Sequence, residues 1–222
     1  GALFPRAKQM CYEEGLHIPL IIAAPDMPEW HDRLTPGSRR REQTALLDVG
    51  ATSLEMAGID VPDYMDTTSL LAGQVREHIF SARDRCEWVV DRVRSVITAR
   101  YHYIHNFMTD RPLAQHNYRS AWPAFVKMKE LYEAGELSDA QALPYGPRPA
   151  EELYDLQEDP HELVNLASSE AHASVLVELR EQVDAWIVDT DDKSQYPERA
   201  AALRITKAQF PKMCIDPIFD GL

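Results

Sequence analysis

The spacing of apolar residues in the first third of the chain predicts a strand followed by a helix. Ile18–Ile22 is a continuous apolar run, typical of a parallel-sheet strand that helices cover on both faces. A loop rich in proline and charge follows it. The next segment repeats its apolar residues at helical spacing, with Thr44 as the candidate N-cap and Gly58 as the stop. The residues expected to face the sheet are Leu46, Leu47, Gly50, Ala51, Leu54 and Ala57.

From Arg76 the pattern changes to short runs rich in β-branched and aromatic residues. Residues 76–83 and 91–107 predict antiparallel strands, with a tight turn at Arg100-Tyr101. A further short strand is expected at 153–156. Together these runs predict a small antiparallel sheet.

Three later segments have helical signals. Pro123 can open a helix that ends at Gly135, and Ser138 with Gln141 fits a capping box. A longer helix should cover the small sheet with one apolar stripe. That stripe consists of Val175, Leu176, Leu179, Val183, Trp186 and Ile187. Residues 191–222 have weak periodicity, so we expect an extended tail with one or two helical turns near 198–203.

Composition and charge narrow the classes of partner. The chain of 222 residues is 45% hydrophobic and 27% charged, as in globular proteins, and its formal net charge is -13. This charge disfavours nucleic acids and anionic membrane surfaces as partners. An anionic substrate would need a local cationic patch. No apolar run is long enough to span a bilayer, and no signal peptide is expected at Gly1.

The sequence predicts no metal site from cysteine or histidine. Cys11, Cys86 and Cys214 form no CxxC pair. The histidines at 102, 105, 116 and 161 lack the paired helical spacing and the clustered acids of a metal site.

Three ordered motifs resemble the C-terminal portion of the sulfatase family, in the alkaline phosphatase superfamily. The first comprises Lys8, Tyr12, Glu14-Gly15 and Ile18–Ile21; the second is residues 60–71, with Thr67 in place of the family's glycine; the third is ELYDLQEDPHELVNLA, residues 152–167. Residues 82–86 and 91–94 are similar to a subgroup that includes heparan N-sulfatases and bacterial arylsulfatases.

The resemblance implies an α/β fold in three parts. Residues 1–72 would be the C-terminal segment of the catalytic α/β sheet domain. Residues 73–190 would form a small antiparallel-sheet subdomain with its covering helix, and residues 191–222 an extended tail.

The resemblance also implies a site for a sulfated small molecule or sugar. Lys8 would contact the sulfate, and His17 would face the same pocket. Arg83, Asp84 and Arg85 would line the substrate cleft, with Asp91 and Arg92 beside it; the planar fork of arginine suits sulfate oxygens. By spacing alone, Lys8 would be a solvated lysine and the charged run from Arg83 a surface ion-pair network.

Sulfatases hydrolyse sulfate esters or sulfamates with a formylglycine and a divalent cation, usually Ca²⁺. The formylglycine motif CxPSR is absent from this sequence, and the Ca²⁺ ligands would lie outside it. We therefore expect the chain to be inactive alone, to have a missing N-terminal sulfatase half as its partner, and to self-associate through exposed apolar surface. Two alternatives remain: a phosphate or phosphonate ester hydrolase of the same superfamily, and a non-catalytic module that binds sugar sulfates. The sequence leaves the compartment open between cytoplasm and periplasm.

Overall fold

The computed structural model describes residues 8–23, 30, 32–193 and 196–222. The chain forms two compact units, one of residues 18–79 and the other of residues 1–17 together with 80–222. Among the described residues, no helix is long and apolar enough to cross a membrane.

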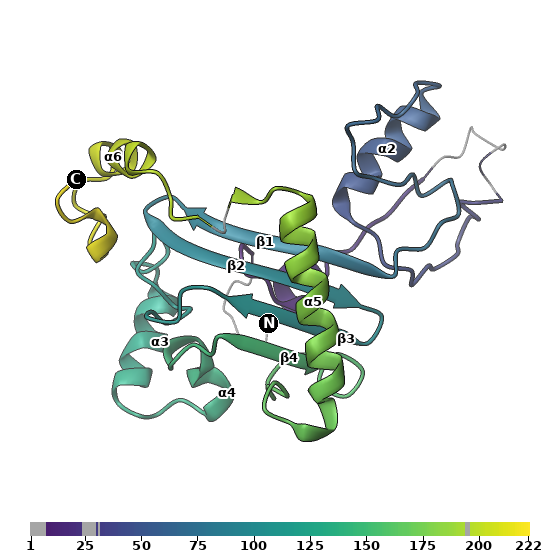
Figure 1. The fold of residues 1–222 in the computed structure, drawn as a ribbon. Coiled ribbons are helices and arrows are strands. Elements are labelled where there is room, and N and C mark those ends of the chain that lie inside the picture. Colours follow the sequence, from purple (N-terminus) through teal and green to yellow (C-terminus); the bar gives the residue numbers. More distant parts are fainter. Residues whose placement is uncertain (1–7, 24–29, 31, 194–195) are drawn as a thin grey trace. The chain divides into compact units, whose positions relative to one another are not determined.

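A four-stranded sheet in the order β1-β2-β3-β4 organises the larger unit (Figure 1). Its strands are β1 (His78–Cys86), β2 (Val89–Thr98), β3 (Tyr101–Asn106) and β4 (Glu151–Asp155). β3 pairs antiparallel with both β2 and β4, which confirms the predicted small antiparallel sheet. Tyr101 is the first residue of β3, so the β2–β3 turn lies one position earlier than expected. Its N–H donates to the Thr98 hydroxyl.

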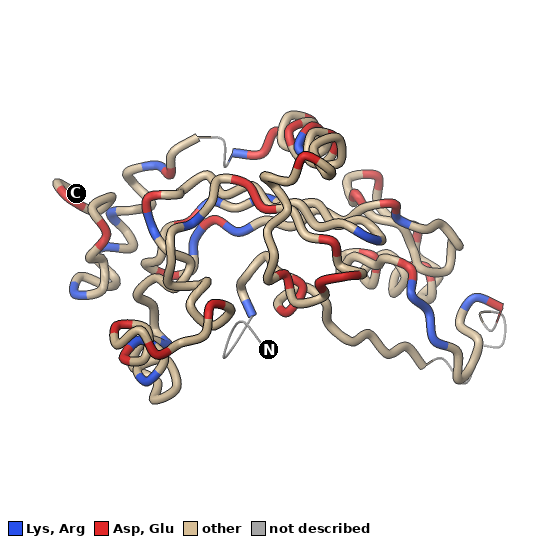
Figure 2. Tube along the Cα trace, turned by 90° about the horizontal axis from the view of Figure 1, so that it is seen from below, with Lys and Arg blue, Asp and Glu red and all other residues tan. Residues whose placement is uncertain are grey.

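The sheet is covered on both faces, as the view along the sheet in Figure 2 shows. On one face lies α5 (Ala173–Asp189), and its predicted stripe packs on Val96, Tyr103 and Leu153 (Figure 1). On the other face Met10, Cys11 and Tyr12 pack on Val93, Ile104 and Tyr154, and the short helix α1 (Glu13–Leu16) follows them. Because successive side chains of a strand point to opposite faces, nearly every position of β2 is buried. Burial on both faces explains why apolar and polar residues alternate only imperfectly along this strand.

The remaining helices of this unit are short. α3 (Pro123–Glu133) starts at proline as predicted, and α4 (Asp139–Ala142) has the predicted Ser138 cap; η2 (Leu143–Tyr145) and η3 (Glu170–His172) are single 3₁₀ turns. The C-terminal segment is more ordered than expected. It holds α6 (Ala200–Gln209) and η5 (Pro217–Phe219), because Leu203 and Phe219 form a small core with Val90.

The smaller unit is built around α2 (Leu46–Met56). Gly58, with φ +69°, ends this helix as predicted. The predicted apolar face is only partly correct: Ala51 is buried as expected, but Leu46 and Leu47 are exposed, while Asp48 and Thr52 are buried. Burial raises the pKa of Asp48, but hydrogen bonds from Arg76, Thr68, Ala45 and Thr67 outweigh it and hold the pKa below its usual value. A buried carboxylate therefore joins α2 to the connector that follows it.

The predicted strand at Ile18–Ile22 is not formed. Residues 17–23 have no regular structure, and Ile21 is 90% exposed. A strand requires a neighbour to satisfy its backbone N–H and C=O groups. Within the described residues, every strand belongs to the four-stranded sheet of the other unit. Apolar character alone therefore does not make this run a strand.

Candidate functional site

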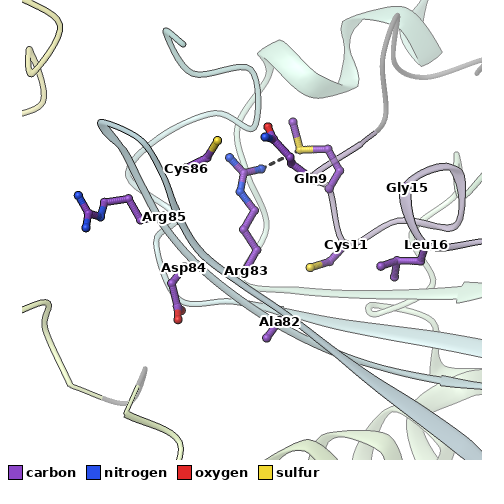
Figure 3. A pocket seen from close by; sticks show the side chains of 10 residues that line it. Gln9, Cys11, Gly15, Leu16, Ala82, Arg83, Asp84, Arg85 and Cys86 are labelled. Atoms are coloured by element: carbon purple, nitrogen blue, oxygen red, sulfur yellow. Dashed lines mark hydrogen bonds between the residues drawn. The ribbon is translucent and has the colours of Figure 1, made fainter. Parts of the chain in front are cut away.

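A pocket of about 330 Å³ lies between the segment that follows Lys8 and the strand β1 (Figure 3). Its walls are Gln9, Met10, Cys11, Gly15 and Leu16 on one side and Ala82, Arg83, Asp84, Arg85 and Cys86 on the other. Two predicted stretches about seventy positions apart in sequence thus share one pocket.

Lys8 lies one residue before the first wall. It is exposed, while Met10 and Cys11 beside it are buried, so the chain turns sharply inward between them. Gln9 accomplishes this turn with φ +83°, a left-handed conformation that is uncommon for residues other than glycine. Arg119 Nη1 donates to the Lys8 carbonyl oxygen at 3.5 Å. The backbone at Lys8 is therefore fixed from outside its own segment.

Arg83 is the cation of the second wall. Its side chain is 9% exposed, and its Nε lies 3.6 Å from Asp91 Oδ2. Its Nη1 donates to the Met10 sulfur at 2.7 Å, so the guanidinium reaches across to the first wall (Figure 3). Arg83 is held in place before any ligand binds.

The two residues after Arg83 point to opposite sides of β1. The Asp84 side chain points away from Arg83 and pairs with Arg94 Nη2 at 2.9 Å (Figure 3). Arg85 Nε pairs with Glu198 at 2.9 Å, and its Nη1 bonds to the Thr206 hydroxyl. Arg85 therefore links the strand to the segment that leads into α6.

The other predicted site residues do not line this pocket. Asp91 is buried behind Arg83 and accepts from Arg148 Nη1 at 2.7 Å. Arg92 points to the α5 face, with its guanidinium carbon 5.8 Å from the Phe107 ring centroid. His17 has an 80% exposed side chain and pairs with Glu13 Oε2 at 3.0 Å. The structure thus brings residues 83–85 together with the segment that directly follows Lys8, and His17 and Arg92 do not line the pocket.

Sequence reasoning missed two residues of the pocket wall, Gln9 and Met10, and the contact of Arg119 with the backbone of Lys8. Glutamine and methionine are not typical of active sites, and no local sequence pattern predicts a contact between Arg119 and Lys8. Cys11 also lines the pocket, but burial raises the pKa of its thiol. It therefore stays protonated at neutral pH and does not serve as a nucleophile.

The described residues do not fit the Ca²⁺ that the resemblance implies. Ca²⁺ takes six to eight oxygen ligands. Among these residues no group of three His, Cys, Asp or Glu side chains is arranged to hold a metal ion. The carboxylate in the pocket wall, Asp84, is already paired with Arg94.

Comparison with known proteins agrees with the motifs. No family model matches the chain. It is 30% identical over 206 residues to an ulvan-active sulfatase of Formosa agariphila. The aligned region covers 89% of this chain and 33% of that protein. It is 29% identical over 213 residues to the human N-sulphoglucosamine sulphohydrolase, covering 86% of this chain and 40% of that protein.

A solved structure of a 2-O GAG sulfatase is also similar, with a TM-score of 0.44 and 23% sequence identity. The match covers 66% of this chain and 25% of the chain of that sulfatase. The chain spans only about a third to two fifths of the two curated relatives.

The two relatives support the resemblance to the C-terminal portion of a sulfatase that the motifs carry. The two proteins to which this portion is similar are named for action on ulvan and on N-sulphoglucosamine.

Proposed function

We propose that this chain is part of a sulfatase that hydrolyses sulfate esters or sulfamates of sugars, and that it supplies the contacts to the sulfate group. The observation that carries the proposal is the pocket in which Gln9 and Met10, directly after Lys8, face Arg83 and Arg85. The names of the two relatives support a sulfated sugar as the substrate class.

The chemical role of these cations follows from where charge develops. Cleavage of a sulfate ester places negative charge on the leaving oxygen and keeps it on the sulfuryl oxygens. Cations that are positioned beforehand stabilise that charge without reorganisation. Arg83 meets this condition because Met10 and Asp91 hold its guanidinium. Lys8 is exposed, so its ammonium can reach a bound anion from the pocket edge.

We assign to this chain a binding role only. The formylglycine and Ca²⁺ of the family would supply the nucleophile and the Lewis acid, and no residue described here is given either task. The isolated chain is accordingly expected not to hydrolyse 4-nitrophenyl sulfate, with or without Ca²⁺. Turnover by the pure chain would contradict this assignment.

The test is to compare Lys8→Ala with Lys193→Ala, whose exposed ammonium pairs with Asp191. Binding of galactose 6-sulfate to the chain is measured by calorimetry. Hydrolysis of the same compound is measured with the longest natural polypeptide that contains this sequence. We expect Lys8→Ala to weaken binding about tenfold, since a hydrogen bond to a charged group contributes about 1.5–3 kcal/mol. Lys193→Ala should change nothing. Equal behaviour of the two variants, or a preference for phosphonate over sulfate esters, would contradict the proposal.

A further inference from the structure

The loop that leads to α2 in the smaller unit contains the longest run of basic residues in the chain, and Figure 2 shows residues 39–41 as a continuous blue stretch. In a chain with a formal net charge of -13, this loop is locally positive. Between residues 32 and 42 it has two acidic residues and four exposed arginines, which are Arg33, Arg39, Arg40 and Arg41. These four arginines are called the arginine patch below.

Contacts within the smaller unit hold two of the four arginines in place. Arg40 Nη1 donates to the carbonyl oxygens of Arg33 at 3.3 Å and of Leu70 at 3.5 Å. The Arg33 guanidinium lies against Gly73, where a Cβ would come within 1.9 Å of Arg33 Nη1. Arg40 thus joins the two ends of the loop, and the glycine at position 73 leaves room for Arg33.

The other two arginines of the patch, Arg39 and Arg41, are available to a ligand. Their side chains form no hydrogen bond or ion pair with a described residue. Arg40 Nε donates to Glu42 Oε1, two positions on, at 3.1 Å, so this carboxylate is already occupied. Such a contact is typical of extended backbone, in which alternate side chains point to the same side. Arg39 and Arg41 then share the opposite side, about 7 Å apart along the backbone.

Two unpaired guanidinium groups so close together suit an anionic polymer better than a single anion. The planar fork of arginine binds two oxygens of a sulfate group at once. One exposed ion pair contributes about 1 kcal/mol or less, so a single sulfate would bind weakly, whereas a chain with several sulfates engages both groups together. Nucleic acids carry a phosphate at every nucleotide, and the net charge of -13 repels this denser charge more strongly.

We propose that Arg39 and Arg41, supported by Arg33 and Arg40, bind a sulfated polysaccharide along the loop that precedes α2. The proposal rests on the function above for the choice of sulfate as the anion. It goes beyond that function because a polymer-binding surface has no use in the hydrolysis of a sulfated monosaccharide.

The test measures binding of dextran sulfate to the chain by calorimetry at several salt concentrations, with unsulfated dextran as the reference. We expect dextran sulfate to bind and dextran not to bind. The affinity should fall as salt rises, because a polyanion releases counterions when it binds. Galactose 6-sulfate, measured in parallel, tests the sulfate pocket separately.

Variants of the patch separate its cations from the charge of the whole chain. Arg39→Gln with Arg41→Gln should weaken dextran sulfate binding about two- to thirtyfold, the range for two exposed ion pairs, and leave galactose 6-sulfate binding unchanged. It should also lower the slope of log affinity against log salt by about one to two. Arg39→Lys with Arg41→Lys keeps the charge and should keep most of the affinity.

The matched control is Arg199→Gln with Arg204→Gln. These two arginines of the C-terminal segment are also exposed and unpaired with described residues, so the control removes the same charge from another place. Since Arg39 and Arg41 hold no described side chain in place, the patch variants should fold as the wild type does, which circular dichroism would check.

Each result decides for or against the patch. Equal loss of affinity in both glutamine double variants would show a general effect of charge and overturn it. Binding of poly-dT or of phosphatidylserine vesicles as tightly as dextran sulfate, at the same salt concentration, would overturn the choice of polymer. If galactose 6-sulfate binds and dextran sulfate does not, the patch is wrong and the sulfate pocket stands. Binding of dextran sulfate that depends on Arg39 and Arg41, without binding of galactose 6-sulfate, supports the patch and contradicts the pocket.

Discussion

At the scale of single residues, buried charge explains how an acidic protein can offer a cationic pocket. Asp91 is 1% exposed and contacts two arginines, Arg148 and Arg83. One carboxylate thus anchors two guanidinium groups, and one of them reaches the pocket. This local excess of positive charge counters the formal net charge of -13.

Removing Asp91 should therefore destabilise the fold strongly. Asp91→Ala leaves Arg148 buried without its partner, and loss of one member of a buried ion pair costs about 3–5 kcal/mol. Urea denaturation would measure this loss as a change in the free energy of unfolding. The control is Asp110→Ala, because the 68% exposed Asp110 side chain pairs with Arg111 near the surface. A change of stability no larger than that of the control would show that the Asp91 contacts contribute little.

At the scale of elements, a polar contact complements the apolar packing of α5 on the sheet. Glu151 of β4 accepts two hydrogen bonds from Arg180 of α5, at 2.6 and 2.8 Å. The Tyr103 hydroxyl of β3 donates to the same carboxylate at 2.6 Å. One glutamate thereby fixes the position of the helix along two strands.

This contact should make stability depend on acidic pH. The bonds from Arg180, and then the one from Tyr103, hold the pKa of Glu151 below its usual 4.5 despite partial burial. A depressed carboxylate pKa stabilises the fold fully above about pH 4.5, and the contribution is lost as pH falls through the folded value. We expect Glu151→Gln to cost about 1 kcal/mol or less at pH 6, because the pair is partly exposed, and less at pH 3 than at pH 6.

The comparison is made by denaturation at both pH values, with Glu181→Gln as the control from an exposed position of α5. Burial lowers the pKa of His105, so protonation of this residue also destabilises the fold below its usual 6.5. Because the charge of Glu151 raises the pKa of His105, the variant also changes this effect, so wild type and variant are both compared in a His105→Gln background. A cost of Glu151→Gln that is the same at both pH values would disprove the linkage.

At the scale of the whole molecule, the smaller unit leaves much apolar surface in water. Its exposed apolar residues include Ile18, Leu20, Ile21, Leu46, Leu47, Ile59, Tyr64 and Val75. Burial of such surface is worth about 25 cal/mol per Å², so contact between copies is favoured. The net charge of -13 opposes contact, and salt screens this repulsion.

The isolated chain should therefore self-associate, and more so at high salt. Sedimentation velocity at two salt concentrations would show the weight-average mass rising with both protein and salt. The double variant Leu20→Lys with Ile21→Lys should reduce association. Val188→Lys, at a 72% exposed position of α5, should not. A monomer at every concentration would contradict this expectation.

Much of the larger unit could be predicted because its signals are local. The stripe of α5, Pro123 at the start of α3 and the Ser138 cap each depend on residues within one or a few helical turns. The ordered motifs likewise carried the resemblance to sulfatases, and two curated relatives support it. For the candidate site, the sequence indicated Lys8 and residues 83–85 but gave no geometry that would join them.

The rest depended on contacts between distant residues. The run Ile18–Ile22 is apolar enough for a buried strand, yet without a paired neighbour it has no regular structure and is largely exposed. The residue facing inward from α2 is Asp48 and not Leu46, because Arg76 neutralises the buried carboxylate. Arg119 reaches Lys8 across 111 positions, and Arg148 reaches Asp91 across 57. The helices, the small sheet and the family resemblance could thus be predicted from the amino-acid sequence, since local periodicity and motifs encode them. The set of cations that share a pocket became known only from the folded structure. The reason is that ion pairing and burial act between segments that lie far apart along the chain.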